Sequence, residues 1–164
     1  MQYIIKGFPL SPTSKELIKL EPKILFTSYF RVVRHSSKKN EKKIMKSGSK
    51  RWIGKSKTAD LCEQLLLKSL LIEKLKQKID EPITCDINLK CIFYYPNSVF
   101  YTKKGIRSKT IGDLDNLTQL PLDCLQKAKI IANDTIVCGL DDTRRMPIDG
   151  HEYFLKIEVS EFHG

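Results

Sequence analysis

The sequence lacks long hydrophobic runs and lacks the cysteine spacings that hold metals or disulfide frameworks. No apolar stretch approaches the roughly 18 residues of a membrane span, and residues 1–8 lack the apolar centre and cleavage site of a signal peptide. The five cysteines are an odd number without a Cys-x-x-Cys pair, which disfavours a secreted disulfide scaffold and a zinc finger. We therefore expect a cytoplasmic protein with reduced thiols.

Length and composition indicate one globular domain. A chain of 164 residues is long enough to bury a core without disulfides or a structural metal. Hydrophobic residues make up 41% and charged residues 29% of the chain, so disorder throughout is not expected. We predict a single domain over residues 1–164, with a basic flexible loop at about 36–57 and a second at about 96–110.

Acidic residues are nearly absent from one segment, which supplies the whole net charge of +10. Residues 31–57 contain eleven lysines and arginines and one acid, Glu41, whereas the rest of the chain is balanced. Such a segment repels itself unless a polyanion neutralises it, and its lysines are interspersed with Trp52 and small polar residues, so nucleic acid is the favoured partner. Two alternatives stay open: a solvated loop that serves solubility, and an anionic membrane surface, which is less favoured because the segment has no regular apolar face.

The hydrophobic pattern predicts an α/β (α+β) fold with two helices. Residues 58–79 carry the clearest helical pattern, with Thr58 as the N-cap and an apolar surface wide enough to contact both a sheet and a partner. A second, short helix is expected within residues 111–128, where Pro121 interrupts or restarts it.

Five segments are predicted to be strands. The clearest is 84–95, which alternates polar and apolar residues and places Cys85 and Cys91 on the core side. The others are residues 2–8, 23–33, 134–140 and 152–162.

Two aspartates two positions apart and a third further along form the most informative cluster. In extended backbone, Asp113 and Asp115 aim their carboxylates to the same side, about 6.5 to 7 Å apart. The helix that follows aligns Asp115 with Gln119 and Asp123, and the chain then returns to Asp134. Neighbouring carboxylates repel each other unless a divalent cation neutralises them, and ligands that are all oxygen favour Mg²⁺ or Mn²⁺.

A purely structural interpretation of these acids is also open. Asp115 suits the N-cap of a helix and Asp134 the start of a strand, which are ordinary roles for a single aspartate. The functional interpretation is favoured by the basic segments that flank the 58–79 helix, because acids for a metal and bases for phosphate together indicate a nuclease.

Three stretches resemble the RusA family of Holliday junction resolvases. They are Gly112-Asp113-Leu114-Asp115-Asn116-Leu117, Leu122-Asp123-Cys124-Leu125 and Asn133-Asp134-Thr135-Ile136-Val137. The family signature is D-x-D-N-L, an L-D-A-L helix and a downstream D-D-x-Q-I-V, and the distance from Asp113 to Asp134 fits this pattern. The resemblance covers about residues 84–162, is weaker over 58–79, and leaves residues 10–50 as an enlarged or divergent insertion.

The resemblance implies a small mixed β-sheet packed by two helices, and a homodimer that cuts four-way junction DNA with Mg²⁺, or with Mn²⁺ in its place. Asp113, Asp115 and Asp134 match the family's catalytic and metal-binding acids. Supporting roles fall on Asn116, Gln119 and Asp123.

The sequence departs from the family pattern near these acids. Gln119 replaces a lysine, so a positive charge is missing there or comes from Lys127, Lys109 or Arg107. Asn133 replaces the first aspartate of the D-D pair, and Ile136 replaces its glutamine.

Phosphates of four-way junction DNA are the expected contacts of the two basic loops. The residues assigned to them are Lys38, Lys39, Lys42, Lys43, Lys46, Lys50, Arg51, Lys103, Lys104, Arg107 and Lys109. Neither a membrane nor a small-molecule cofactor is an expected partner. Two other functions stay open: a junction-binding protein with weakened chemistry, suggested by Gln119 and Asn133, and a Mg²⁺-dependent nuclease acting on other branched DNA or on RNA.

Overall fold

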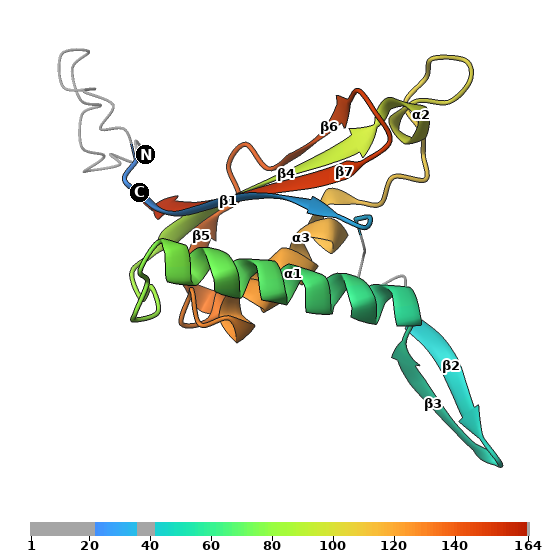
Figure 1. Cartoon of the computed structure of the whole chain (residues 1–164), viewed down its shortest axis with the longest axis horizontal. Coiled ribbons are helices and arrows are strands. Elements are labelled where there is room, and N and C mark those ends of the chain that lie inside the picture. Colours follow the sequence, from blue (N-terminus) through green and yellow to red (C-terminus); the bar gives the residue numbers. More distant parts are fainter. Residues whose placement is uncertain (1–21, 36–41, 164) are drawn as a thin grey trace, which may run out of the picture.

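A five-stranded sheet forms the centre of the molecule (Figure 1). The computed structural model describes residues 22–35 and 42–163. The strands of the sheet are β1 (Ile24–Val32), β4 (Ile87–Pro96), β5 (Val137–Gly139), β6 (Arg144–Ile148) and β7 (Tyr153–Glu161). β7 lies between β1 and β4 and is antiparallel to both, whereas β5 and β6 share the other edge of β4 and run parallel to it. The sheet is therefore mixed, and the predicted α+β class is confirmed.

The central strand β4 follows the predicted alternation. Ile87, Leu89, Cys91 and Phe93 are all buried and contribute to the main hydrophobic core. The prediction for Cys85 is wrong, because the strand begins two residues later and this side chain is exposed.

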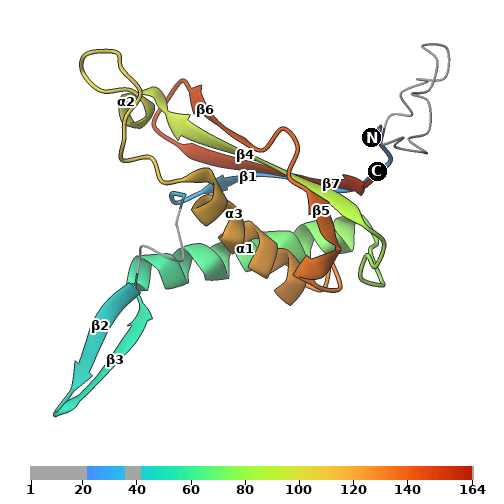
Figure 2. The same ribbon diagram turned by 180° about the vertical axis from the view of Figure 1, so that it is seen from behind.

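Two helices cover one face of the sheet, as Figures 1 and 2 show from opposite sides. They are α1 (Lys57–Lys76) and α3 (Leu114–Lys127). Their most deeply buried contributions to the core are Leu70 on α1 and Cys124 and Leu125 on α3. A third helix, α2 (Asn97–Phe100), is a single turn at the end of β4, inside the segment predicted as the second loop. No helix in the described part of the chain has both the length and the apolar character of a membrane span.

Two local predictions about the helices are wrong. Ser56, not Thr58, caps α1: its Oγ accepts a hydrogen bond of 3.1 Å from the Ala59 N–H, and Thr58 already lies within the first turn. Helix α3 runs through Pro121 without interruption. The pyrrolidine ring is fully buried, and this burial offsets the hydrogen bond that a proline removes from the helix.

A β-hairpin replaces the central part of the predicted first loop. β2 (Lys42–Ser47) and β3 (Lys50–Lys55) are antiparallel, and Gly48 takes the positive φ of 58° that the tight turn requires. The hairpin extends away from the body at the start of α1 in both views (Figures 1 and 2). The polar–apolar alternation typical of a strand cannot be recognised in this part of the sequence, because lysines occupy both odd and even positions along the two strands.

The remaining strand predictions are partly confirmed. The predicted strands at 23–33 and 152–162 correspond to β1 and β7. Residues 134–140 instead form a 3₁₀ turn, η1 (Asp134–Ile136), followed by the short β5, because the Asn133 side chain accepts a hydrogen bond of 3.0 Å from the Thr135 N–H and caps the turn. Strand β6 is not among the predicted strands. It pairs only with β4 at an edge of the sheet, a position where a proline such as Pro147 is tolerated. The strand predicted at 2–8 lies outside the described residues.

His35 is expected to make the stability of this fold fall as the pH drops. Its ring nitrogen Nε2 lies 2.8 Å from the carbonyl oxygen of Tyr94, and the ring packs against Phe93, Tyr95 and Tyr153. Burial lowers the pKa of His35 to about 4. The neutral ring therefore contributes stability that is complete above the unfolded pKa of about 6.5 and is lost as the pH falls towards 4, by about 3 kcal/mol in all.

Urea unfolding of the wild type at pH 7 and at pH 4.5 measures this loss. In His35→Gln the difference between the two pH values should shrink by most of that amount, whereas in the control His151→Gln, which changes an exposed histidine, it should match the wild type. An undiminished difference in His35→Gln contradicts the assignment.

Candidate active site

The first turn of α3 carries two of the three predicted acids. Asp113 is the N-cap residue with an extended backbone, and its carbonyl oxygen accepts a hydrogen bond of 3.0 Å from the Leu117 N–H. Its carboxylate makes no capping hydrogen bond and is exposed. Asp115, the second residue of the helix, is exposed as well. The interpretation of Asp115 as a mere N-cap is therefore wrong, and both carboxylates are available at the positive end of the helix dipole.

A pocket of about 530 Å³ joins the start of α3 to the η1–β5 segment. Asp115 and Asp134 both line it, so two acids separated in sequence face the same space. The other lining residues are Thr118, Gln119, Leu122, Val137, Cys138, Gly139 and Leu140. This pairing arises because β5 runs parallel to the start of β4 and thereby brings residues 134–140 against α3.

Asp113 is not among the residues that line this pocket. Within the described ranges, no three His, Cys, Asp or Glu side chains gather closely enough to form a metal site of their own. The pocket thus offers two carboxylates, with the third acid at the N-cap of the same helix. Two carboxylates fit Mg²⁺, which is commonly held by one or two protein carboxylates together with water and substrate phosphate.

The three supporting residues have different positions. Gln119 lines the pocket, whereas Asp123 is half-buried further along α3 and does not. Asn116 is buried, and its Oδ1 has no hydrogen-bond partner among the described residues. Cys138 is a pocket residue that the sequence interpretation did not identify, because its place in the pocket depends on how η1 and β5 pack.

The three candidates for a positive charge near the acids are not equivalent. Lys127 is paired with the buried Glu63 on α1, and this hydrogen bond raises the pKa of Lys127. Its charge therefore serves the contact between the two helices. Lys109 is exposed. Arg107 lies near Arg145 of β6, a residue that the sequence interpretation missed because β6 itself was not predicted.

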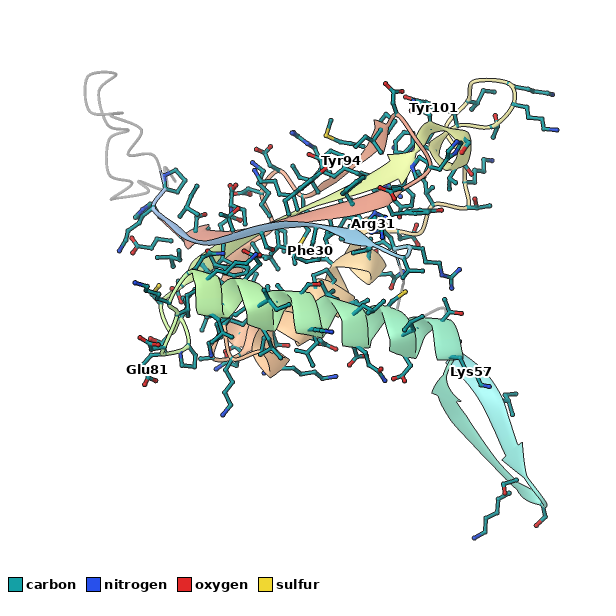
Figure 3. All side chains as sticks on the ribbon, viewed as in Figure 1. Phe30, Arg31, Lys57, Glu81, Tyr94 and Tyr101 are labelled. Atoms are coloured by element: carbon teal, nitrogen blue, oxygen red, sulfur yellow. The ribbon has the colours of Figure 1, made fainter. Side chains whose placement is uncertain are left out.

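The structure places most of the predicted DNA contacts in two separate segments. Lys103, Lys104, Arg107 and Lys109 are exposed in the loop that leads from α2 to α3. A bridge between Tyr101 and Arg107 closes their loop beside α2, where Figure 3 labels Tyr101. The flexibility expected of this segment stays a prediction. The other segment is the β2–β3 hairpin, whose backbone positions hold Lys42, Lys43, Lys46, Lys50 and Arg51. Lys38 and Lys39 lie outside the described residues.

A small α+β domain with paired carboxylates in a pocket and basic segments beside it has the composition of a metal-dependent nuclease. Comparison with protein families supports a nuclease: residues 37–158 match the family model described as endodeoxyribonuclease RusA. The chain belongs to the RusA family. A search of curated proteins finds no match.

Membership makes this protein an endodeoxyribonuclease of a family that resolves Holliday junctions in DNA recombination. Resolvase nucleases of this kind generally use divalent metals. The match begins at residue 37, so the basic hairpin and α1 belong to the family domain. Part of the stretch expected to be an enlarged or divergent insertion, residues 37–50, thus lies within the matched range.

Proposed function

We propose that this protein resolves four-way DNA junctions by paired, symmetric nicks, using Mg²⁺ or Mn²⁺ held by Asp115 and Asp134 with Asp113 beside them. The observation that carries the proposal is the pocket that Asp115 and Asp134 share at the start of α3. When bound, the metal would supply Lewis-acid stabilisation of charge on the scissile phosphate and lower the pKa of a coordinated water.

The chain's own residues have distinct tasks in this mechanism. Asp134, on the η1 side of the pocket, orients the attacking water and accepts its proton, because a carboxylate at hydrogen-bond distance is a competent general base. Asp115 faces it from α3, and Gln119 supplies a neutral amide that hydrogen-bonds a phosphate oxygen without charge. Attack in line with the leaving group yields a 5′-phosphate and a 3′-hydroxyl, ends that a ligase can rejoin.

Paired nicking calls for two active sites related by a two-fold axis, and a homodimer provides them. An apolar stripe on α1 favours this arrangement. Its members share one face of the helix, opposite the buried face, and are exposed: Leu61, Leu65, Ile72 and Leu75. Leu75 is 78% exposed, which is costly for a leucine of a lone protomer. We infer that this stripe lies in the dimer interface.

Leu65→Glu combined with Ile72→Glu is expected to convert the dimer into a monomer, because it places two like charges in an apolar contact. Sedimentation velocity at micromolar concentration measures the state. The matched control is Thr84→Glu combined with Gln126→Glu, which adds the same two negative charges at exposed positions outside α1 and should leave the dimer intact. A wild type that sediments as a monomer, or a double variant that remains dimeric, contradicts the interface.

A panel of labelled substrates tests the function as a whole. With Mg²⁺, the wild type should nick a four-way junction in two symmetric strands faster than a flap, a linear duplex or an RNA hairpin. Tight binding to the junction without nicking at any Mg²⁺ or Mn²⁺ concentration would favour the alternative of a binding protein. Preferential cleavage of the flap or the RNA would favour the other nuclease functions.

A further inference from the structure

Arg145 ties strand β6 to the backbone that leads into the acidic helix. Its Nη1 donates hydrogen bonds to the carbonyl oxygens of Ile111, at 3.0 Å, and Gly112, at 2.5 Å. These two residues immediately precede Asp113, the N-cap of α3. The guanidinium group is therefore fixed at the end of α3 where the acids begin.

Arg107 is brought to the same place by the loop that follows α2. The loop is closed by the Tyr101–Arg107 bridge and by a hydrogen bond of 2.8 Å from the Thr102 N–H to the Ile106 carbonyl oxygen. The guanidinium carbon of Arg107 lies 5.7 Å from the ring centroid of Phe100, a cation–π distance, and Phe100 itself is buried. A buried ring and a closed loop thus restrict where this charge can be.

The two arginines are close enough to repel each other. Burial, and after it the charge of Arg107, lower the pKa of Arg145, while Tyr95 and Asp113 act in the opposite direction. In the part of the chain that the structure describes, neither arginine forms an ion pair with a carboxylate. Arginine stays protonated in proteins, so an anion is what relieves this repulsion.

We propose that Arg107 and Arg145 together bind one backbone phosphate of the DNA strand that is cut, and so seat that strand at the Asp113 end of the acidic pocket. The site rests on the proposed function, since it serves the same strand. Guanidinium groups present paired N–H donors that match phosphate oxygens, and the N-terminal end of α3 adds favourable potential for an anion. Arg107 is the main donor, because Arg145 also holds the backbone before Asp113.

Arg107→Gln is expected to lower the affinity for a four-way junction by about tenfold to a hundredfold, the range for losing a charged hydrogen bond. Arg107→Lys should keep part of the affinity, because it retains the charge without the planar fork. The matched control is Arg144→Gln, which removes an exposed arginine one position earlier on β6 and should change affinity by less than threefold. Affinity is measured in EDTA, so that no nicking interferes.

Junctions with a single methylphosphonate, placed in turn at each phosphate around the crossover, locate the contact. At the phosphate that the two arginines bind, the neutral group should weaken the wild type about as much as Arg107→Gln does, and should weaken Arg107→Gln no further. If the two losses multiply at every position, or if Arg107→Gln and Arg144→Gln bind alike, the site is overturned. A wild type that binds the junction but never nicks it contradicts the proposed function and leaves this comparison of affinities decisive.

Discussion

Asp134→Asn is expected to lower the rate of junction nicking by about a thousandfold while the affinity for the junction stays equal or rises. The carboxylate that faces Asp115 across the pocket would be lost, and with it several kcal/mol of transition-state stabilisation; about 4 kcal/mol corresponds to a thousandfold. Affinity does not fall, because removing a negative charge reduces repulsion of the phosphates. Single-turnover nicking with Mg²⁺ and binding in EDTA measure the two quantities separately.

Asp115→Asn and Asp113→Asn should also lose nicking activity. Comparing the two losses shows how much the acid in the pocket and the acid at the N-cap each contribute to nicking. Asp115 lines the pocket with Asp134, whereas Asp113 does not, so equal losses for all three would show that the acids act together once DNA is bound. Asp80→Asn is the matched control, because this aspartate is exposed just after α1 and belongs to no part of the site. Nicking at the wild-type rate by Asp134→Asn would refute the site.

The sequence was enough to predict those features that depend on a local pattern, or on a chain that returns to the same end of the domain within a few turns. The alternation in 84–95 predicted the buried face of β4, because side chains of a strand point to opposite sides whatever the strand pairs with. The pairing of Asp115 with Asp134 in one pocket also follows the prediction, since the chain returns to the same end of the domain after α3.

What could not be predicted depends on contacts between distant segments. Arg145 has no motif around it, and its position beside Asp113 exists only because β6 pairs in parallel with the second half of β4. Lys127 has the right charge for the active site, but its partner Glu63 lies on α1, and no spacing along the chain reveals that ion pair. The hairpin was missed for a different reason: its cations mask the apolar cross-strand pairs Ile44–Ile53 and Met45–Trp52.

Neutralising four charges of the β2–β3 hairpin is expected to reduce junction affinity by about a thousandfold at 0.15 M salt. The hairpin spans residues 42–55, which include six lysines and arginines and no acid, and each phosphate contact contributes a slope of about −0.9 to the dependence of log affinity on log salt. The variant combines Lys43→Gln, Lys46→Gln, Lys50→Gln and Arg51→Gln. Its salt slope should therefore be about 3.6 units shallower than that of the wild type if all four cations contact phosphates.

A control with the same change in net charge distinguishes direct contacts between the hairpin and DNA phosphates from the general effect of the protein's positive charge. It combines Lys23→Gln, Lys76→Gln, Lys78→Gln and Lys129→Gln, none of which belongs to the hairpin, and its slope should stay close to that of the wild type. Strands β2 and β3 pair only with each other in the sheets of the described chain, so the hairpin variant should keep the wild-type melting temperature.

A two-stranded ribbon of this kind fits the major groove of duplex DNA, which makes an arm of the junction its natural binding partner. If the hairpin variant instead binds with the wild-type slope, the segment is a solvated projection, and the phosphates must be bound by the loop that leads into α3.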